Sequence, residues 1–275
     1  MIDFHVHMGR IYRHDYPAGI GLTVEQLIDW MDRNGIKIGV LLPLESPEGA
    51  SGYFTTEEAV EARDTYPQRL IAFMCVDPRM ACVEQLIDSW MRRFGVSGFG
   101  EHINELPFDD ERNQVIYRKC DEYGLPLVFD MNSRYLTDEV GLPRFEACLK
   151  EFPNVKWVGH GPAFWSAISA DDPRGGYPAE PIEPGGALDR LFAEYGNLYA
   201  DLSAGSGYNA MARDPEFTLG FLERHWPRLM FGTDVVFHTH HIPQFEWFRN
   251  LDVSAEIRDA IAEGNARKVL GLEWL

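Results

Sequence analysis

Two histidines lie two residues apart near the start of the chain, in the stretch MIDFHVHMG. In a β-strand the side chains of residues i and i+2 point to the same side, so His5 and His7 face the same way if this stretch is a strand. On a helix the same spacing splays them apart. The pair is therefore either two incidental polar residues at a strand end or half of a site that needs two imidazoles.

Further polar residues directly follow apolar stretches in the rest of the chain. They are Glu101 and His102 in GFGEH, Asp130 and Asn132 in VFDMN, His160 in VGHG, Asp201 in YADLS and Asp234 in FGTD. Imidazoles and carboxylates together suit Zn²⁺, Mn²⁺ or Fe²⁺. His160 and Asp234 also stand near glycines, which allow an ion or a ligand to approach closely. Such residues form one site only if the fold brings the ends of several strands together.

Apolar stretches of strand length alternate with amphipathic stretches of helical length along the whole chain. The candidate strands are 2–7, 38–43, 69–78, 96–102, 125–130, 154–160, 197–203 and 228–234, and the candidate helices cover about 22–35, 55–67, 80–95, 110–123, 142–151, 186–195, 215–225 and 254–270. This alternation predicts βα units and a parallel sheet. Eight units in about 250 residues match a (β/α)8 barrel. We therefore expect an α/β fold, a single (β/α)8 TIM barrel that forms one domain over residues 1–275.

Local signals support the helices. Thr23 and Thr55 stand where N-caps belong, and Gly35, Gly95 and Gly124 stand where helices should end. The segment 161–185 is rich in Pro, Gly and Asp and has neither a helical nor a strand period, so we predict a long loop after the sixth strand. In a barrel this loop lies at the carboxyl-terminal mouth, where it is either a lid or a surface decoration.

The barrel would bring the scattered polar residues together, because the carboxyl ends of all its strands open onto one mouth. A lone His or Asp at a strand end is more often a hydrogen-bonded cap than a metal ligand. A His-x-His after the first strand, with Glu101 after the fourth, His160 after the sixth and Asp234 after the eighth, is a pattern that chance supplies poorly. We therefore interpret the set as a metal site.

The composition is that of a soluble globular protein, with 45% hydrophobic and 25% charged residues. A formal charge of −18 argues against a DNA or RNA substrate, since nucleic-acid affinity depends on neutralising phosphates. No apolar run approaches a membrane span and no signal peptide is evident, so we expect a cytoplasmic protein that does not bind membranes. Cys75, Cys82, Cys120 and Cys148 lack the spacing of a zinc or redox motif, and we expect them to be reduced and mostly buried.

The motifs DFHVHMG, VGHG and FGTD, with the closing GNARKVLGL, resemble the metal-dependent amidohydrolase superfamily over nearly the whole chain. The resemblance is to its branch of small amidohydrolase-related barrels, the amidohydrolase 2 type, which includes lactone hydrolases and non-oxidative decarboxylases of aromatic acids. It implies a (β/α)8 barrel with one or two divalent metals, zinc first and manganese or iron as alternatives. The implied ligands are His5, His7 and Asp234, together with His160.

Two positions depart from this resemblance. Many relatives carry a histidine at the end of the fifth strand, where this chain has Asp130 in LPLVFDMNS. Glu101 stands where two-metal members have a group that bridges the ions. The best ligand set is therefore His5, His7, Glu101, His160 and Asp234. If it holds one ion only, His160 is free to act as an acid, a base or a group that polarises a carbonyl.

The reaction that follows from these ligands is hydrolysis of an amide, ester or lactone bond in a small molecule. A divalent ion lowers the pKa of bound water, and Asp234 can accept a proton from that water and pass it to the leaving group. Asp234 and His160 are thus the catalytic candidates. The main alternative is non-oxidative decarboxylation of an aromatic carboxylic acid. In another functional class, the barrel could have lost catalysis and serve as a binding scaffold.

The substrate side of the site is less defined, and each candidate has a structural alternative. Asp130 either contacts the substrate or metal or caps a loop, and His102 either faces the site or points out of the barrel. Candidate contacts are the aromatic residues Phe164, Trp165, Tyr177 and Tyr208, the arginines Arg10, Arg134 and Arg174, and the histidines His238, His240 and His241. From these we select Asp130, Trp165, Arg134 and His238. The sequence leaves the formation of a homo-oligomer open.

Overall fold

The computed structural model describes residues 1–11, 21–49 and 52–272. Within these ranges eight parallel strands follow the chain in the predicted order: β1 (Ile2–Val6), β4 (Ile38–Leu41), β6 (Leu70–Ala72), β7 (Phe99–His102), β8 (Pro126–Asp130), β9 (Lys156–His160), β10 (Leu198–Asp201) and β11 (Leu229–Met230). Strands β1, β4 and β6 form one ladder, and β7 to β11 form a second, five-stranded one. The predicted α/β class is thus confirmed.

The two ladders meet on both sides, which closes the barrel. On one side Val6 of β1 bridges Val235, and the Phe4 amide donates to the Phe231 carbonyl at 3.0 Å. On the other side Met74 bridges Phe99 of β7, and the Met74 amide donates to the Gly98 carbonyl at 2.9 Å. The carboxyl ends of all eight strands therefore face a common mouth.

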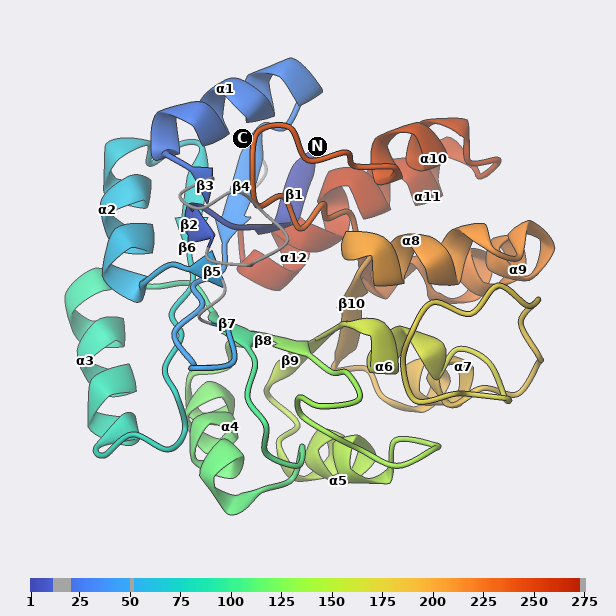
Figure 1. Ribbon diagram of the computed structural model, residues 1–275, viewed down its shortest axis with the longest axis horizontal. Coiled ribbons are helices and arrows are strands. Elements are labelled where there is room, and N and C mark those ends of the chain that lie inside the picture. The colour runs from blue at the N-terminus through green and yellow to red at the C-terminus, as the bar shows by residue number, and fades with distance from the viewer. Residues whose placement is uncertain (12–20, 50–51, 273–275) are drawn as a thin grey trace.

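Helices surround this barrel (Figure 1). They are α1 (Val24–Asn34), α2 (Thr56–Thr65), α3 (Val83–Phe94), α4 (Glu111–Tyr123), α5 (Pro143–Glu151), α6 (Pro162–Ser166), α7 (Ala187–Glu194), α8 (Ala204–Ala212), α9 (Pro215–His225), α10 (Gln244–Asn250), α11 (Ala255–Asp259) and α12 (Asn265–Leu270). A 3₁₀ turn covers Trp226–Arg228, and a π-helical turn over Ala260–Gly264 joins α11 to α12. No helix of the described residues is long and apolar enough to cross a membrane.

The predicted helix boundaries agree with the structure where a cap defines them. Thr23 and Thr55 cap α1 and α2, each in a reciprocal capping box. Gly35, Gly95 and Gly124 end α1, α3 and α4 in the left-handed conformation that glycine adopts without strain. Three of the four cysteines are buried and all four are free, as expected, with Cys82 exposed.

Several elements differ from the sequence prediction. The segment 161–185 was expected to hold no regular element, but it begins with the short helix α6. The single helix predicted over 254–270 is divided by the π-helical turn, and α8 and α10 were not predicted. A small antiparallel sheet of β2 (Gly9–Ile11), β3 (Gly21–Leu22) and β5 (Gly52–Tyr53) was also missed. These elements are short, so local periodicity gives little signal for them.

The barrel interior is closed at its amino end by an apolar cluster that includes Phe4, Val40, Phe73, Val128 and Val158. Other side chains of the same strands, such as Leu127 and Trp157, point outward and pack under the helices in a second cluster. Strand alternation thus divides each strand between the interior and the helix layer. Above the apolar cluster, the same strands carry the polar residues of the mouth.

Candidate metal centre and active-site cavity

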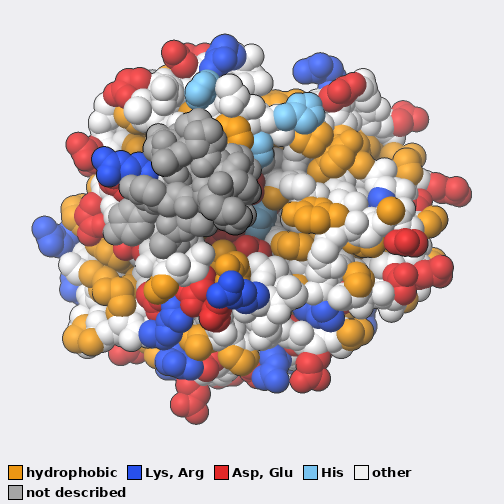
Figure 2. Space-filling model, in the orientation of Figure 1, with side chains coloured by type: hydrophobic (Ala, Val, Ile, Leu, Met, Phe, Trp, Pro, Cys, Tyr) orange, Lys and Arg blue, Asp and Glu red, His pale blue; other side chains and the backbone are white. Residues whose placement is uncertain are grey.

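A cavity of about 590 Å³ opens at the carboxyl-terminal mouth. The described residues that line it include His7, Glu48, Glu101, Asp130, Asn132, Tyr135, His160, Tyr177, Asp234, His240, His241 and the apolar side chains of Leu44, Ile103, Val236 and Ile242. Figure 2 shows this face, with histidine and acidic side chains in a hollow near its centre. Residues from distant parts of the chain meet here because every strand ends at this mouth.

His7 lies at the floor of this cavity with His5 next to it, and both are buried. The register of β1 against β4 shifts between Asp3 and Val6, so Phe4 joins the apolar cluster while His5, the next residue, joins the polar one. The ring of His5 donates from Nδ1 to the Asp201 carboxylate at 3.0 Å, and that of His7 donates from Nδ1 to the Leu42 carbonyl at 2.8 Å. Because Nδ1 carries the proton in both bonds, Nε2 is the unprotonated nitrogen of each neutral ring.

These free nitrogens face each other and two carboxylates. His5 Nε2 and His7 Nε2 are 3.1 Å apart. The Glu101 Oε2 atom lies 3.6 and 3.3 Å from them, and Asp234 Oδ1 lies 3.8 and 3.1 Å from them. Because each Nδ1 holds the ring proton, all four atoms are acceptors in the neutral form of the rings. A cation at their centre satisfies such an arrangement, as does a further proton on one of the rings.

A divalent ion fits this set of donors. Zinc–nitrogen distances of 2.0–2.1 Å in a tetrahedral site place neighbouring ligand atoms roughly 3.3–3.4 Å apart, and the separations between 3.1 and 3.8 Å surround that value. The donor atoms of His5, His7 and Asp234 all lie within 4.8 Å of one another. Imidazole and carboxylate ligands admit zinc, manganese or iron, and the geometry alone does not select among them.

The pKa values of these groups show how negative the centre is. Burial lowers the pKa of His7, but its contacts with Asp234 and Glu101 outweigh burial and raise that pKa to about 9. Burial likewise opposes protonation of His5, yet Asp201 and Glu101 raise its pKa well above the usual range. Burial would raise the pKa of Glu101, but His5 and His7 hold it well below normal. Such a potential favours any bound cation.

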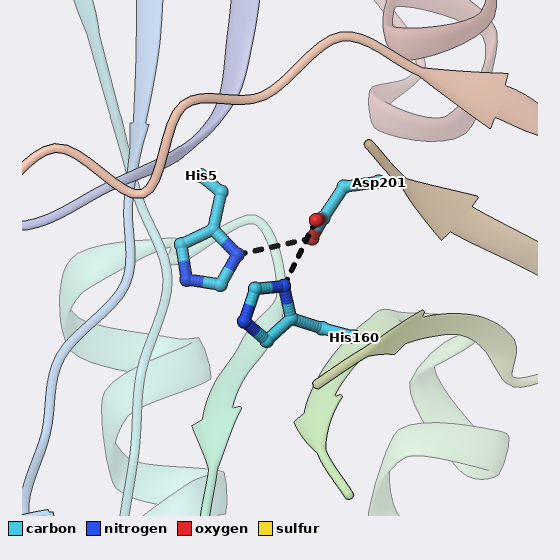
Figure 3. Close-up of side chains that lie close together, drawn as sticks. All are labelled: His5, His160 and Asp201. Carbon is cyan, nitrogen blue, oxygen red and sulfur yellow. Dashed lines mark hydrogen bonds and ion pairs between the residues drawn. The ribbon is translucent and has the colours of Figure 1, made fainter. Parts of the chain in front are cut away.

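Asp201, at the end of β10, orients two histidines at once (Figure 3). One carboxylate oxygen accepts from His5 Nδ1 and the other from His160 Nδ1, each at 3.0 Å. The Ser203 hydroxyl donates to the second oxygen at 2.5 Å. His5, His160 and Asp201 also form a cluster of possible metal donors. Their facing atoms, however, are already joined by hydrogen bonds from the imidazoles to the carboxylate. We therefore interpret Asp201 as the outer partner that aims both Nε2 atoms into the cavity.

A second buried aspartate, Asp3, links β1 to the segment after β11 by hydrogen bonds. Asp3 accepts from the His5 and Thr233 amides at 3.2 and 3.0 Å, and from the Thr233 hydroxyl at 2.6 Å. The neighbouring Gly232 leaves room for this arrangement, because a Cβ there would lie 2.9 Å from Ser203 Cβ and 3.3 Å from His5 Cβ. Asp3 thus fixes His5 on β1 relative to the Thr233–Asp234 segment after β11.

His160 and Asp130 lie side by side on the opposite wall, since β8 and β9 pair in register there. His160 Nε2 is 3.9 Å from Glu101 Oε1. Among the described residues, Asp130 Oδ1 is buried with no hydrogen-bond partner, and Oδ2 has the Asn132 amide alone, at 3.5 Å. Burial, with Glu101 nearby, raises the pKa of Asp130 to about 7. Gly161 accommodates this carboxylate, because a Cβ there would lie 2.0 Å from Asp130 Oδ1.

The five predicted metal-site residues, His5, His7, Glu101, His160 and Asp234, thus lie around one cavity floor. Asp201 was noted in the sequence only as a polar strand end, and Asp3, Ser203 and Thr233 were missed. The one available signal was an aspartate inside an otherwise apolar strand, as in YADLS and MIDFH. Their partners lie far away in the chain, so the sequence could not supply their roles.

Some of the predicted substrate contacts line the cavity and others lie away from it. Asp130 lines the cavity, as do Tyr177, His240 and His241. Trp165 is 1% exposed and packs against Phe164 in the core, away from the lining. Its helix α6, which the sequence did not predict, turns it inward. His102 is also buried, and its ring contacts Asn113 at 3.1 Å outside the cavity.

Two further predicted contacts lie at the surface. Arg134 is exposed and pairs with Glu105, and His238 is exposed as well. Neither lines the cavity, and the same holds for Arg10, Arg174 and Tyr208. Exposed side chains of loops extend towards water unless a buried partner holds them, which local sequence does not reveal.

Comparison with known proteins places the chain in context. The family model described as "Amidohydrolase" matches residues 2–272, nearly the whole chain. A search of curated proteins found no match.

Solved structures resemble this one along most of its length. A putative 2-pyrone-4,6-dicarboxylic acid hydrolase from Pseudomonas putida is 21% identical, with a TM-score of 0.64, and the match covers 100% of this chain and 98% of that chain. The 2,6-dihydroxybenzoate decarboxylase from Rhizobium is 16% identical, with a TM-score of 0.63 and 98% of both chains covered.

A third structure contains a metal. The 5-carboxyvanillate decarboxylase from Novosphingobium aromaticivorans, complexed with manganese and 4-hydroxy-3-methoxy-5-nitrobenzoic acid, is 17% identical, with a TM-score of 0.63 and 91% and 81% of the two chains covered. At such identities these likenesses establish the fold, and a further similar structure is described as a TIM-barrel protein.

Proposed function

The chain belongs to the amidohydrolase family, and on that premise we propose that it is a metal-dependent hydrolase that cleaves an amide, ester or lactone bond in a small molecule. One observation carries the proposal. The Asp234 carboxylate lies 3.1 Å from His7 Nε2, yet its side chain is 27% exposed and lines the cavity. It therefore contacts the candidate metal ligands on one side and the space for substrate on the other.

The residues that would hold the proposed ion are His5, His7 and Asp234, with Glu101 as a further ligand. When bound, a divalent ion lowers the pKa of water and polarises a carbonyl group. We favour zinc because of the imidazole ligands, and the manganese in the Novosphingobium structure makes manganese the second ion to test.

The residues of the chain carry the proton transfers in this proposal. Asp234 accepts a proton from the attacking water and delivers it to the leaving group. His160 has Nδ1 engaged by Asp201, so it offers Nε2 to the cavity, either as a ligand or as a group that contacts the carbonyl oxygen. Asp201 maintains this orientation of His160 together with that of His5. The apolar lining excludes part of the water around the reacting bond.

Decarboxylation is the second candidate, because two of the similar solved structures are decarboxylases of aromatic acids. The cavity lining weighs against it. Among the described lining residues there are four carboxylates, Glu48, Glu101, Asp130 and Asp234, and no lysine or arginine. With the ion balancing Glu101 and Asp234 and Arg79 pairing with Glu48, an aromatic carboxylate would be attracted to the ion and repelled by Asp130. Hydrolysis is therefore the proposed reaction.

The test compares Asp234→Asn with the unaltered protein, both loaded with zinc or manganese. Hydrolysis of 4-nitrophenyl acetate, acetanilide and dihydrocoumarin is measured, together with CO₂ release from 2,6-dihydroxybenzoate. We expect hydrolysis by the unaltered protein and a loss of about 10²–10⁴-fold in the variant, because a general base contributes that much. Metal analysis should show an ion still bound, with weaker affinity.

Asp252→Asn is the matched control, since Asp252 is an exposed aspartate outside the cavity lining. It should leave hydrolysis unchanged. Full activity of Asp234→Asn contradicts the role of Asp234. Release of CO₂ without any hydrolysis supports the decarboxylase instead, and absence of both reactions together with absence of bound metal returns the binding scaffold to consideration.

A further inference from the structure

The cavity walls carry more carboxylates than the candidate metal centre uses. Glu101 and Asp234 are the carboxylates that contact the histidine nitrogens at the floor. Two more, Glu48 and Asp130, line the walls away from that centre. A divalent ion at the floor balances the first two, so the charge on the walls is a separate feature.

Among the described residues, an arginine offsets one of these two wall charges and not the other. Arg79 donates to both oxygens of the lining residue Glu48, at 2.8 and 2.7 Å, and also to Asp77, so the charge of Glu48 is balanced by a guanidinium that does not itself line the cavity. Arg174 donates to Asp172 at 2.8 Å and to the Ala163 carbonyl at 3.1 Å. Arg134 pairs with Glu105 at the surface. None of these arginines lines the cavity.

Among the described residues, this leaves Asp130 as the acidic wall residue that has no arginine or lysine partner. Its Oδ1 atom is buried and unpartnered, and the long contact with Asn132 is the one hydrogen bond of Oδ2 among the described residues. A buried carboxylate without full hydrogen bonding is costly unless a donor completes it. Because Oδ1 is packed against Gly161, Oδ2 is the atom that an occupant of the cavity can complete, and a positively charged N–H donor does so best.

The rest of the wall suits an apolar body next to such a donor. Leu44, Ile103 and Ile242 are apolar side chains of the lining, and Tyr135 and Tyr177 add aromatic rings. Aromatic rings attract cations over their faces and pack against flat apolar groups. The same lining gives a carboxylate on the substrate no lysine or arginine among the described residues.

We propose that the substrate of this hydrolase carries a cationic nitrogen, an ammonium, amidinium or guanidinium group, beside an apolar body, and that Asp130 binds this group. The inference rests on the proposed function only in placing the substrate in this cavity. It assigns Asp130 to substrate selection by charge, while the bond cleavage remains with the residues at the floor.

The test uses three nearly isosteric ligands, benzamidine, benzamide and benzoate, which carry a positive charge, no charge and a negative charge. Their dissociation constants for the zinc-loaded protein are measured by calorimetry, which does not depend on turnover. We expect benzamidine to bind about tenfold more tightly than benzoate or better, because a hydrogen bond to a charged group is worth a factor of that order. The comparison is stringent because the carboxylate of benzoate can bind to the zinc ion, which favours benzoate.

The variant Asp130→Asn keeps the size of the side chain and removes its charge. It should weaken benzamidine binding about tenfold and change benzamide binding little. Glu105→Gln is the matched control, because it removes one acidic charge from the same face outside the cavity lining. It should leave all three dissociation constants unchanged.

Benzoate binding as tight as benzamidine binding overturns the inference, and so does an unchanged preference in a folded Asp130→Asn variant. If that variant fails to fold, the order of the three ligands on the unaltered protein decides the question alone. Ester or amide hydrolysis without the expected charge order contradicts this inference only. The expected charge order without any hydrolysis contradicts the proposed function only.

Discussion

The amino and carboxyl ends of the barrel interior are built from the same strands, yet Phe4, Phe73 and Val128 close the first while His5 and Glu101 lie in the second. At the amino end, contacts are made between rings and aliphatic groups, as between Phe4 and Phe73 with centroids 6.0 Å apart. At the carboxyl end, buried imidazoles and carboxylates form a hydrogen-bonded network whose geometry suits a bound cation.

This difference shows where stability and chemistry reside in the fold. The apolar end contributes burial, which is insensitive to the exact partner, while the polar end depends on individual hydrogen bonds. Register shifts occur at the boundary in both β1 and β7. In β1 the shift places Phe4 in the apolar cluster and the next residue, His5, in the polar network. Packing of Phe4 therefore also fixes the position of His5. Three changes test that division, from the largest expected effect to the smallest.

Removing one aromatic ring from the apolar end should cause the largest loss of stability. Phe73 is fully buried against Phe4 and against Gly98, where a Cβ would lie 2.4 Å from the ring. We expect Phe73→Ala to lower the free energy of unfolding by about 3–5 kcal/mol, measured by urea denaturation. Zinc affinity of the folded protein should not change.

Phe73→Leu is the control for this prediction and should cost less, because it retains more of the buried volume. A Phe73→Ala variant that keeps its stability and loses the ion would reverse the proposed division of roles.

Removing the ion should cost less than removing the ring. An ion present at about 100 times its dissociation constant stabilises the folded state by about 2.7 kcal/mol if it does not bind the unfolded chain. We expect chelation to lower the melting temperature while the far-ultraviolet circular dichroism at 25 °C remains that of a folded barrel. Complete unfolding on chelation at that temperature would show that the polar end, rather than the apolar end, maintains the fold.

The smallest effect should come from the outer partner of the ligands. Asp201→Asn keeps the shape, but an amide cannot accept hydrogen bonds from both His5 and His160 through two oxygens. Partners of this kind are worth about 10–100-fold in metal affinity, so we expect a loss of that size in a competition titration with a chelator.

Ser203→Ala is the matched control, because it leaves the Asp201 carboxylate and both histidine contacts in place. Its effect on metal affinity should be smaller than that of Asp201→Asn. Equal affinities for Asp201→Asn and the unaltered protein would remove Asp201 from the metal centre.

Much of the fold follows from local sequence. Alternating apolar and amphipathic stretches predicted the eight strands in order, and Thr23, Thr55 and the terminal glycines marked helix boundaries. The short elements α6, α8 and α10 were not predictable, since five to nine residues contain too few periods and tertiary packing decides their conformation. The unpredicted helix α6 buries Trp165, which sequence reasoning had placed at the substrate.

The sequence by itself determined that His5 and His7 share a face, because the period of a strand is a local property. It also determined which strand ends carry carboxylates and imidazoles. Only the tertiary structure decided that Asp201 serves two histidines, that Asp3 joins β1 to Thr233, and that Arg134 lies outside the cavity. These facts depend on distances between residues separated by as many as 230 positions, and such distances are fixed by barrel closure rather than by neighbours in sequence.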